Sequence, residues 1–310
     1  MSANIKRLKA RIKSVDSTLH LTKAMQLVAS GKIRKATEQL HASRSYTDAV
    51  KSVVSALARS KECASSPFIA GHKAGKNTGK TLLIVIAGDR GLAGGYNSNA
   101  FRLADSVNAD ELVPIGRRSV DRAIGGAHGR MSPVSEGYAT ERFTPEDSKR
   151  LASAICERYL SGEIGRVMIV STRYVSVLTQ NAVLTQLLPV DKNASIEMFS
   201  NRGKDQKRSN KEDAAPKAEH ELEDGGYMEF EPDPNSVLSV AIPEYVSSMI
   251  YGAVRESFAS EVAARRFAMD SATKNGIVMK DNLSLEYNRA RQGAITQEIV
   301  EIVAGAGDKQ

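Results

Sequence analysis

The last part of the chain, residues 243–303, contains no proline after Pro243. Proline suits the first position of a helix, because its missing N–H would have no partner there. With a rise of 1.5 Å per residue, a continuous helix over this stretch would be roughly 90 Å long. A single compact domain cannot bury a helix of that length, so we expect a second long element to pack along it.

The other end of the chain supplies such an element. Apolar residues there alternate at spacings of three and four, the heptad pattern of a left-handed coiled coil. The first proline is Pro67, so the sequence predicts one helix from about Asn4 to about Lys61. Its seam consists of Ile5, Leu8, Ile12, Val15, Leu19, Thr22, Gln26, Ala29, Ile33, Ala36, Leu40, Ser43, Thr47, Val50, Val54 and Leu57.

Two long helices at opposite ends of one chain predict an antiparallel coiled coil. The C-terminal helix brings many small side chains to this pairing, and small side chains let two backbones approach closely. They are Gly252, Ala253, Ala259, Ser260, Ala263, Ala264, Ala268 and Ala272. The alternative is a bundle of separate helices, but bundle helices seldom exceed about 25 residues without a coiled-coil reason.

Charge indicates what the N-terminal helix meets. Residues 1–60 carry twelve Lys or Arg against Asp16, Glu38 and Asp48, which gives 12 − 3 = +9, compared with +7 for the whole chain. A basic helix attracts nucleic acid or an acidic protein surface. Tyr46 is its only Phe, Trp or Tyr, so the helix offers few aromatic side chains on which the bases of a single strand could stack. An acidic protein partner therefore fits better than nucleic acid.

Composition limits the protein class. The chain is 41% hydrophobic and 25% charged, which is ordinary for a soluble protein. We find no run of 18 apolar residues and expect no membrane span. Because the heptad pattern starts at Ile5, we expect no targeting peptide. Cys63 and Cys156 lack metal-ligand spacing and are interpreted as reduced structural thiols, which favours a cytoplasmic compartment.

The middle of the chain alternates strand and helix patterns, which favours a small doubly wound, Rossmann-like α/β domain. Residues 62–80 are rich in Gly, Lys, Ser and Pro and are expected to form a linker. Strands are expected at 81–87, 111–115, 166–171 and 182–190, and helices at 98–109, after Arg117 and at 145–160 with Thr144 as the N-cap. A glycine-rich turn occupies residues 88–97.

Residues 191–224 differ in composition, since they are highly charged and have few apolar positions. Such a segment cannot bury enough apolar surface to offset its ordering entropy. We therefore expect a flexible excursion there, followed by a strand at 227–231. The predicted domain organisation is a helix over 1–61, a linker over 62–80, an α/β domain over 81–242 that includes the excursion, and a second helix over 243–310.

Motifs for catalysis are weak in this sequence. Residues 71–81 resemble a P-loop, but Ala74 replaces a required glycine and Thr81 opens a strand instead of a helix. The turn at 88–97 lacks the G-x-G-x-x-G spacing, so a structural turn is favoured over a dinucleotide site. We find no Gly-x-Ser-x-Gly elbow, no His-Glu-x-x-His pair and no clustered histidines. The sequence predicts no catalytic, cofactor or metal site.

These features come together in a family resemblance that covers nearly the whole chain except residues 191–224. The sequence resembles the γ subunit of F-type ATP synthase at its opening helix, its glycine turn and its last helix. Leu21 stands where the family usually has Ile. The motifs are Ile5-Lys6-Arg7, Arg11-Ile12-Lys13-Ser14-Val15, 21–29, 87–97, Ser257, Ser260-Glu261, Ala263-Ala264-Arg265, Ala268-Met269, Ala272-Thr273, Asn275, 287–292 and 295–299.

The resemblance implies a role and a set of partners. The γ subunit is a central shaft whose coiled coil stands inside a ring of α and β subunits. Its α/β domain sits on the membrane rotor ring of c subunits, beside the ε subunit. Rotation driven by proton flow changes the nucleotide affinity of each β subunit in turn, so ATP chemistry belongs to those subunits. The implied location is the cytoplasmic face of the bacterial plasma membrane, with membrane contact only through the complex.

The same resemblance implies contacts to the β subunits. By position these are Lys23 and Met25 on the first helix, and Arg291, Gln292 and Thr296 on the second. We also hypothesise that a small-residue, polar surface on the shaft lets it turn with low barriers. Two alternatives remain: a basic coiled-coil adaptor that binds nucleic acid, and a nucleotide-binding enzyme that uses the turn at 88–97.

Overall fold

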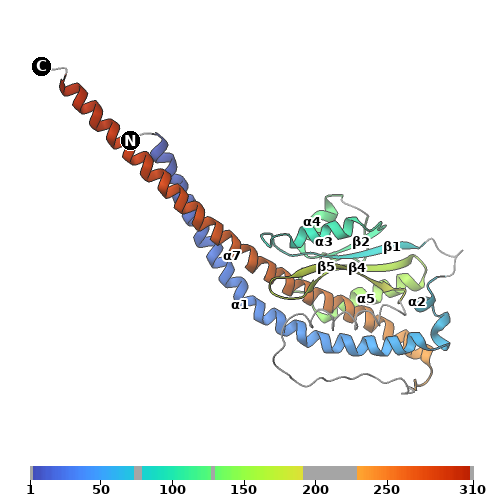
Figure 1. The fold of residues 1–310 in the computed structure, drawn as a ribbon. Helices are drawn as coiled ribbons and strands as arrows, with labels where there is room; N and C mark the ends of the chain where they lie inside the picture. Colours follow the sequence, from blue (N-terminus) through green and yellow to red (C-terminus); the bar gives the residue numbers. More distant parts are fainter. Residues whose placement is uncertain (1–2, 73–78, 127–129, 191–228, 308–310) are drawn as a thin grey trace, which may run out of the picture. The chain divides into compact units, whose positions relative to one another are not determined.

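A computed structural model describes residues 3–72, 79–126, 130–190 and 229–307. Two long helices, α1 (Ala3–Arg59) and α7 (Pro234–Gly307), come from the two ends of the chain (Figure 1). The chain divides into two compact units, and each long helix contributes to both. The coiled-coil unit comprises Met1–Arg34, Leu92–Gly94 and Val262–Gln310, and the α/β unit comprises Lys35–Gly91 and Gly95–Glu261.

Burial along α1 follows the predicted heptad. Every predicted seam position, from Ile5 to Leu57, is buried or half-buried. The two helices run antiparallel in each unit, since Thr22 contacts Thr273 in the coiled-coil unit and Thr47 contacts Ser248 in the α/β unit. The predicted coiled coil of N- and C-terminal helices is confirmed.

The α/β unit is built on a five-stranded sheet in the order β3-β2-β1-β4-β5. β1 pairs in parallel with both β2 and β4, β3 pairs in parallel with β2, and β5 runs antiparallel to β4. This order is the Rossmann order with a reversed edge strand, so the α/β prediction is confirmed. The strands are β1 (Lys80–Ile86), β2 (Glu111–Ile115), β3 (Arg130–Met131), β4 (Ile164–Tyr174) and β5 (Gln180–Leu188).

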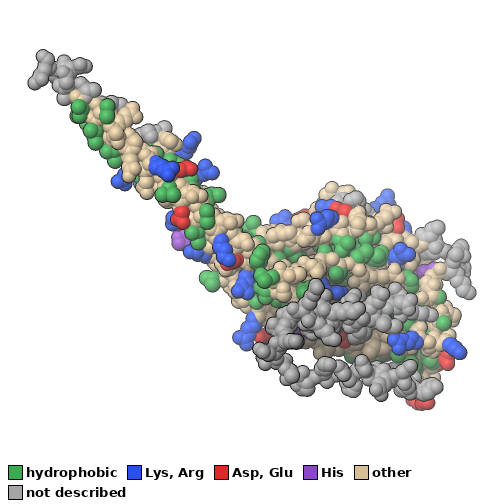
Figure 2. Space-filling model, in the orientation of Figure 1, with side chains coloured by type: hydrophobic (Ala, Val, Ile, Leu, Met, Phe, Trp, Pro, Cys, Tyr) green, Lys and Arg blue, Asp and Glu red, His purple; other side chains and the backbone are tan. Residues whose placement is uncertain are grey.

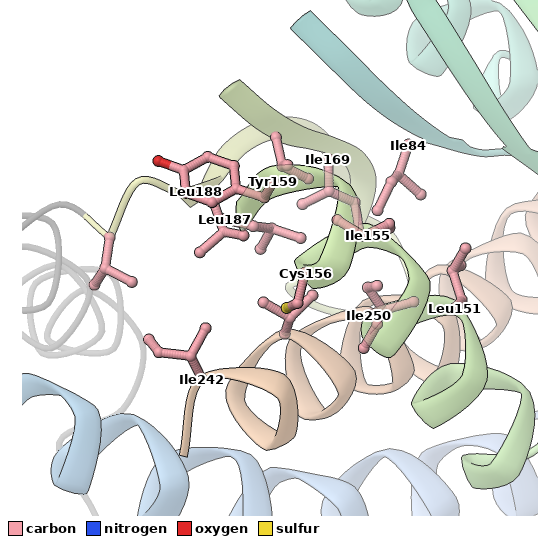
Figure 3. Packing of buried hydrophobic residues seen from close by; sticks show 14 of the residues in the cluster. Ile84, Leu151, Ile155, Cys156, Tyr159, Ile169, Leu187, Leu188, Ile242 and Ile250 are labelled. Carbon is pink, nitrogen blue, oxygen red and sulfur yellow. The ribbon is translucent and has the colours of Figure 1, made fainter. Parts of the chain in front are cut away.

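Helices cover both faces of this sheet. The larger core lies on one face, where Ile84 and Ile169 of the sheet pack with α5 (Pro145–Leu160) and with Ile242 and Ile250 of α7 (Figure 3). The opposite face packs Leu83, Val85 and Val170 under α3 (Tyr96–Asp105), beside α4 (Arg117–Ile124). Because β1 is buried on both faces, its continuous apolar sequence is explained.

The start of α5 is fixed by a capping box. Thr144 Oγ1 accepts a hydrogen bond from Asp147 N at 3.1 Å, and Asp147 Oδ2 accepts one from Thr144 N at 2.9 Å. Pro145 follows at the first helical position. The predicted cap and the predicted bounds of this helix are therefore confirmed.

The predicted start of the C-terminal helix was wrong. α7 begins at Pro234, and Pro243 lies inside it. Asp233 caps the helix, because its Oδ1 accepts hydrogen bonds from the backbone N–H groups of Asn235 and Ser236, each at 2.9 Å. The same rule that favoured Pro243 applies better to Pro234, which follows a capping aspartate. Burial of Ile242 and its neighbours holds Pro243 in a helix that it would otherwise weaken.

The stretch expected to be a linker is partly structured. It contains a 3₁₀ helix, η1 (Glu62–Ser65), and a short helix, α2 (Pro67–Ala70). Cys63, Phe68 and Ile69 are buried in the core of the α/β unit, which polar neighbours in the sequence concealed. Both cysteines are free and buried, as predicted.

Other boundaries shift or fall outside the described residues. The two-residue strand β3 was not predicted. The described residues 229–231 are not a strand, whereas 227 and 228 lie outside the described part. The excursion at 191–224 and positions 73–78 of the P-loop-like stretch also lie outside it.

One segment of α7 is apolar enough to cross a membrane by length and composition. An 18-residue window has a mean hydropathy of 1.4, and 39% of it is buried within the structure. The first half of α7 packs Leu238, Ile242, Val246, Ile250 and Val254 into the core of the α/β unit. A core helix passes the same test, and the packing accounts for the hydropathy.

Candidate functional site

The coiled-coil unit presents the candidate site, and polar pairs set its register. The Thr273 hydroxyl donates to the Thr22 hydroxyl at 2.8 Å, and both side chains are buried. Gln26 Nε2 donates to Asp270 Oδ1 at 3.1 Å. Such buried polar contacts fix the alignment of two helices more strictly than apolar packing does.

A further ion pair joins the helices nearer their ends. Lys280 donates to Asp16, and this hydrogen bond holds the pKa of the Asp16 carboxyl below its usual range. Because both helices rise equally per residue, this pair places Ala3 opposite about residue 293 of α7. The last turns of α7 therefore extend beyond the start of α1, as Figure 1 shows.

The two helices approach closely at Gly276. A Cβ atom added there would lie 2.6 Å from Leu19 Cδ2, which is closer than side chains come in folded proteins. Leu19 is itself buried, with 7% of its surface exposed. Any larger residue at 276 would therefore force Leu19 out of the space that it fills.

The outside of the unit is basic along α1. Eight Lys and Arg side chains there are exposed, and Asp16 is the one acidic residue among positions 1–34, so 8 − 1 = +7. The eight are Lys6, Arg7, Lys9, Arg11, Lys13, Lys23, Lys32 and Arg34. The positive charge predicted for the first helix is thus concentrated on an exposed surface.

The outside is also hydrophobic, which the sequence-based hypothesis of a polar shaft surface missed. Figure 2 shows green side chains between the basic ones along this unit. Leu27 is 73% exposed on α1, and Ile302 is 71% exposed on α7. The exposed hydrophobic residues of the unit are Leu21, Leu27, Val28, Leu92, Phe267, Ile277, Val278, Met279, Leu285, Ile295, Ile299, Val300, Ile302 and Val303. That hypothesis was wrong, because apolar positions outside the heptad seam have nowhere to be buried within the chain.

The five predicted interface residues fall into two groups. Lys23 is exposed and Met25 is half-buried, beside the Thr22–Thr273 contact. Arg291, Gln292 and Thr296 are exposed near the end of α7. Arg291 lies 291 − 273 = 18 residues beyond Thr273, which is about 27 Å along the helix.

The two groups are therefore separate patches on one unit. The Thr296 hydroxyl donates to Gln292 O at 3.0 Å, a bond within the helix that leaves its outer face available to a partner.

The glycine-rich turn does not have the geometry of a nucleotide site. Glu261 of α7 is 2% exposed, and its carboxyl carbon lies 2.7 Å from where a Cβ atom of Gly88 would be. Asn97 Oδ1 accepts the hydrogen bond of the Gly88 N–H at 2.9 Å. The Glu261 side chain occupies the space beside Gly88 that a phosphate would need, and the Gly88 N–H is already bound to Asn97. The structural interpretation of the turn is favoured.

Metal binding has no support in the described ranges, where no three His, Cys, Asp or Glu side chains are grouped to hold an ion. Burial raises the pKa of the Cys156 thiol to about 12, which makes it a poor nucleophile.

Comparison with known proteins decides the family. The ATP synthase family model matches residues 4–307. The ATP synthase gamma chain of Ruminococcus albus is 40% identical over 97% of this chain and 96% of its own. The sodium ion specific ATP synthase gamma chain of Acetobacterium woodii is 37% identical over 99% of both chains. The chain belongs to the ATP synthase γ-chain family.

The γ-chain fold extends to distant structures. A chain of the Euglena gracilis mitochondrial ATP synthase, solved with OSCP, F1 and c-ring, superposes with a TM-score of 0.59 at 16% identity. The superposition covers 99% of this chain and 96% of that one. A chain of the Euglena rotor gives a TM-score of 0.57. The fold is thus kept where the sequence has changed greatly, and γ-chain membership gives the adaptor and enzyme alternatives no support.

Proposed function

We propose that this chain is the rotating central shaft of an F-type ATP synthase. It couples ion flow through the membrane sector to ATP synthesis in the catalytic β subunits and influences their ATPase activity. It is a non-catalytic subunit of that enzyme, and it binds no nucleic acid.

The observation that carries this proposal is the exposed hydrophobic surface of the coiled-coil unit. A coiled coil that stood in water would bury its apolar seam and present polar side chains elsewhere. Here apolar side chains such as Leu27, Val278 and Ile302 are more than half exposed outside the seam. Surfaces of this kind mark protein contacts. They support a shaft that is enclosed by partner subunits on several sides.

The charge of α1 also supports contact with partner subunits. The exposed basic residues of α1 complement an acidic surface, which steers association and sets orientation. We propose that Lys23 and Met25 form one contact with the β subunits, and that Arg291, Gln292 and Thr296 form a second contact farther along α7.

The other proposed partners are assigned to different parts of the chain. We propose that the long helices α1 and α7 act as the shaft, with α7 starting at Pro234 and not at 243. Residues 62–80 then connect α1 to the sheet of the α/β domain, and this domain binds the ε subunit and the c-ring. The α and β subunits surround the shaft. The chain is then a peripheral membrane protein, held at the cytoplasmic face of the bacterial plasma membrane through the complex.

Site-specific photo-cross-linking in the complete synthase tests this assignment. A photoreactive residue in place of Thr296 should give adducts with β or α subunits, identified by mass. Arg130, exposed on β3 of the α/β unit, is the control position and should give no β adduct. Adducts of Thr296 with neither subunit would contradict the shaft assignment.

A further inference from the structure

A band of buried polar residues lies on α7 where that helix leaves the α/β unit. Earlier along the helix the buried face is mostly apolar, with Ile242, Val246, Ile250 and Val254. Between positions 255 and 261 it becomes polar. Arg255, Ser257, Ser260 and Glu261 are 5%, 0%, 0% and 2% exposed. We call these four residues the polar band.

The band holds the end of β4 by its backbone. Ser257 Oγ accepts the hydrogen bond of Thr172 N at 3.0 Å. Ser260 Oγ donates to Thr172 O at 3.2 Å. Both backbone groups of one strand residue are thus bound to side chains of α7.

The band also holds the glycine-rich turn. Tyr96, the first residue of α3, is 5% exposed, and its hydroxyl donates to Ser257 O at 3.0 Å. Burial raises the pKa of this hydroxyl, so Tyr96 stays a neutral donor at physiological pH. Glu261 lies against Gly88, where any larger residue would collide with its carboxylate. The glycine-rich turn therefore packs directly against α7.

A third contact closes the set. Arg255 Nη2 donates to Thr140 O at 2.6 Å and to Phe143 O at 3.0 Å. The Thr140 hydroxyl donates in turn to Asp89 Oδ2 at 2.8 Å, and Thr140 N donates to Asp89 Oδ1 at 3.2 Å. Because Asp89 belongs to the glycine-rich turn, the loop at 140–143 and the turn hold each other as well as α7.

The directions of these contacts matter more than their number. With 3.6 residues per turn, successive side chains are about 100° apart around a helix, so the band spans an arc of about 220°. The hydrophobic effect is non-directional, so it fixes the rotation of a helix less strictly than hydrogen bonds do. Hydrogen bonds lose strength as their angles change. Contacts on several sides of α7 therefore resist twisting about its axis.

We propose that the polar band is the grip through which the α/β unit and α7 exchange torque, with Tyr96, Asp89 and Gly88 as positioning residues. This inference rests on the proposed shaft function and gives the glycine-rich turn a mechanical role. The turn binds the helix that rotates with it, in the place where related sheet topologies bind phosphate.

The test uses the complete synthase in inverted membrane vesicles. The variant carries Ser257→Ala and Tyr96→Phe, which removes two of the contacts without adding bulk. The matched control is Ser119→Ala, since Ser119 is also buried, at 3% exposure, and its hydroxyl donates to Val85 O at 2.9 Å without touching α7. Two rates are measured: ATP synthesis against an imposed ion gradient, and ATP hydrolysis after an ionophore has collapsed the gradient.

The grip predicts a change in the ratio of these rates. Hydrolysis without load should remain near the wild-type rate, whereas synthesis under load should fall by about thirtyfold, the factor that two lost buried hydrogen bonds bring to a two-state equilibrium. Ser119→Ala should keep the wild-type ratio, because it removes a buried hydrogen bond of the α/β unit that does not involve α7. Grip variants that assemble and retain the wild-type ratio would overturn the proposal.

Two further outcomes separate this proposal from the function on which it rests. If the double variant does not assemble, Tyr96→Phe alone keeps the ring packing and is judged by the same ratio. The shaft function itself is tested separately, by depleting this chain from the wild-type synthase with an antibody. ATP synthesis that continues after depletion would refute the shaft function.

Discussion

Arg158→Met should expose how strongly a buried carboxylate depends on its partner. Glu111 lies on β2 with 7% of its side chain exposed, and Arg158 of α5 binds it through two hydrogen bonds of 2.9 and 3.1 Å. Lys80 and Ser132 add hydrogen bonds of 3.1 and 3.0 Å. The arginine is the main cause that lowers the pKa of Glu111 from 4.5 to about 2.

The magnitude follows from these values. Lowering the pKa from 4.5 to about 2 corresponds to about 3 kcal/mol of stabilisation of the charged carboxylate. Removing one partner of a buried ion pair costs about 3–5 kcal/mol, because the other charge stays buried. We expect Arg158→Met to lower the free energy of unfolding by about 3 kcal/mol at pH 7.

Urea unfolding of the full-length chain, followed by circular dichroism, measures this loss. Arg150→Met is the matched control on the same helix, since the Arg150 side chain is 59% exposed and solvent screens its ion pairs, so the loss of stability should be much smaller. Adding Glu111→Leu to Arg158→Met should restore most of the stability, because it removes the unpaired charge.

The loss should also depend on pH. The folded pKa of Glu111 lies below its unfolded value, so its contribution is present above pH 4.5 and is lost as the pH falls towards 2. The difference between wild type and Arg158→Met should shrink across that window. Equal costs for Arg158→Met and Arg150→Met, or a cost that does not change with pH, would refute this reasoning.

Three other substitutions test the helices, each by urea or thermal unfolding of the full-length chain. Pro243→Ala should raise the free energy of unfolding by about 1–3 kcal/mol, because proline is unfavourable inside a helix; a loss of stability would contradict its placement. Gly276→Val should cost about 1–3 kcal/mol through its collision with Leu19, whereas Gly293→Val, with nothing within 4 Å, should cost less. Thr144→Ala should cost about 1 kcal/mol by breaking the capping box of α5, and no change would show that the cap is replaced by water.

Periodic features of the sequence predicted the fold well. The heptad seam of α1 is buried or half-buried along its whole length, because alternate spacings of three and four residues keep it on the side that faces α7. The apolar strand before Gly88 and the N-cap at Thr144 are local signals, and both were confirmed. A doubly wound α/β domain followed from the alternation of strands and helices, whereas the strand order and the antiparallel β5 are known only from the structure.

The misses share a cause, since each depends on contacts distant in sequence. Pro243 resembles a helix start, and only the burial of its neighbours keeps it inside α7. Phe68 and Ile69 are two apolar residues in a polar stretch, and the core they enter is made by other elements. β3 is two residues long and exists only as a partner of β2.

The interface could be predicted only in part. The resemblance named five residues, which the structure separates into two patches: Lys23 and Met25 on α1, and Arg291, Gln292 and Thr296 on α7. The exposed hydrophobic residues of the coiled-coil unit could have been found from the sequence, because Leu27, Val28 and Val278 lie off the seam. They indicate a partner-binding surface only once the structure shows that they stay exposed on the coiled-coil unit.

Purification of this chain from its native membranes tests the central claim most directly. A tagged chain, solubilised with mild detergent and analysed by mass spectrometry, should bring down the α, β and ε subunits of ATP synthase together with the c subunit. The association should persist at high salt, because exposed apolar surface contributes to it. Recovery of the chain alone, or with nucleic acid that salt removes, would contradict the account.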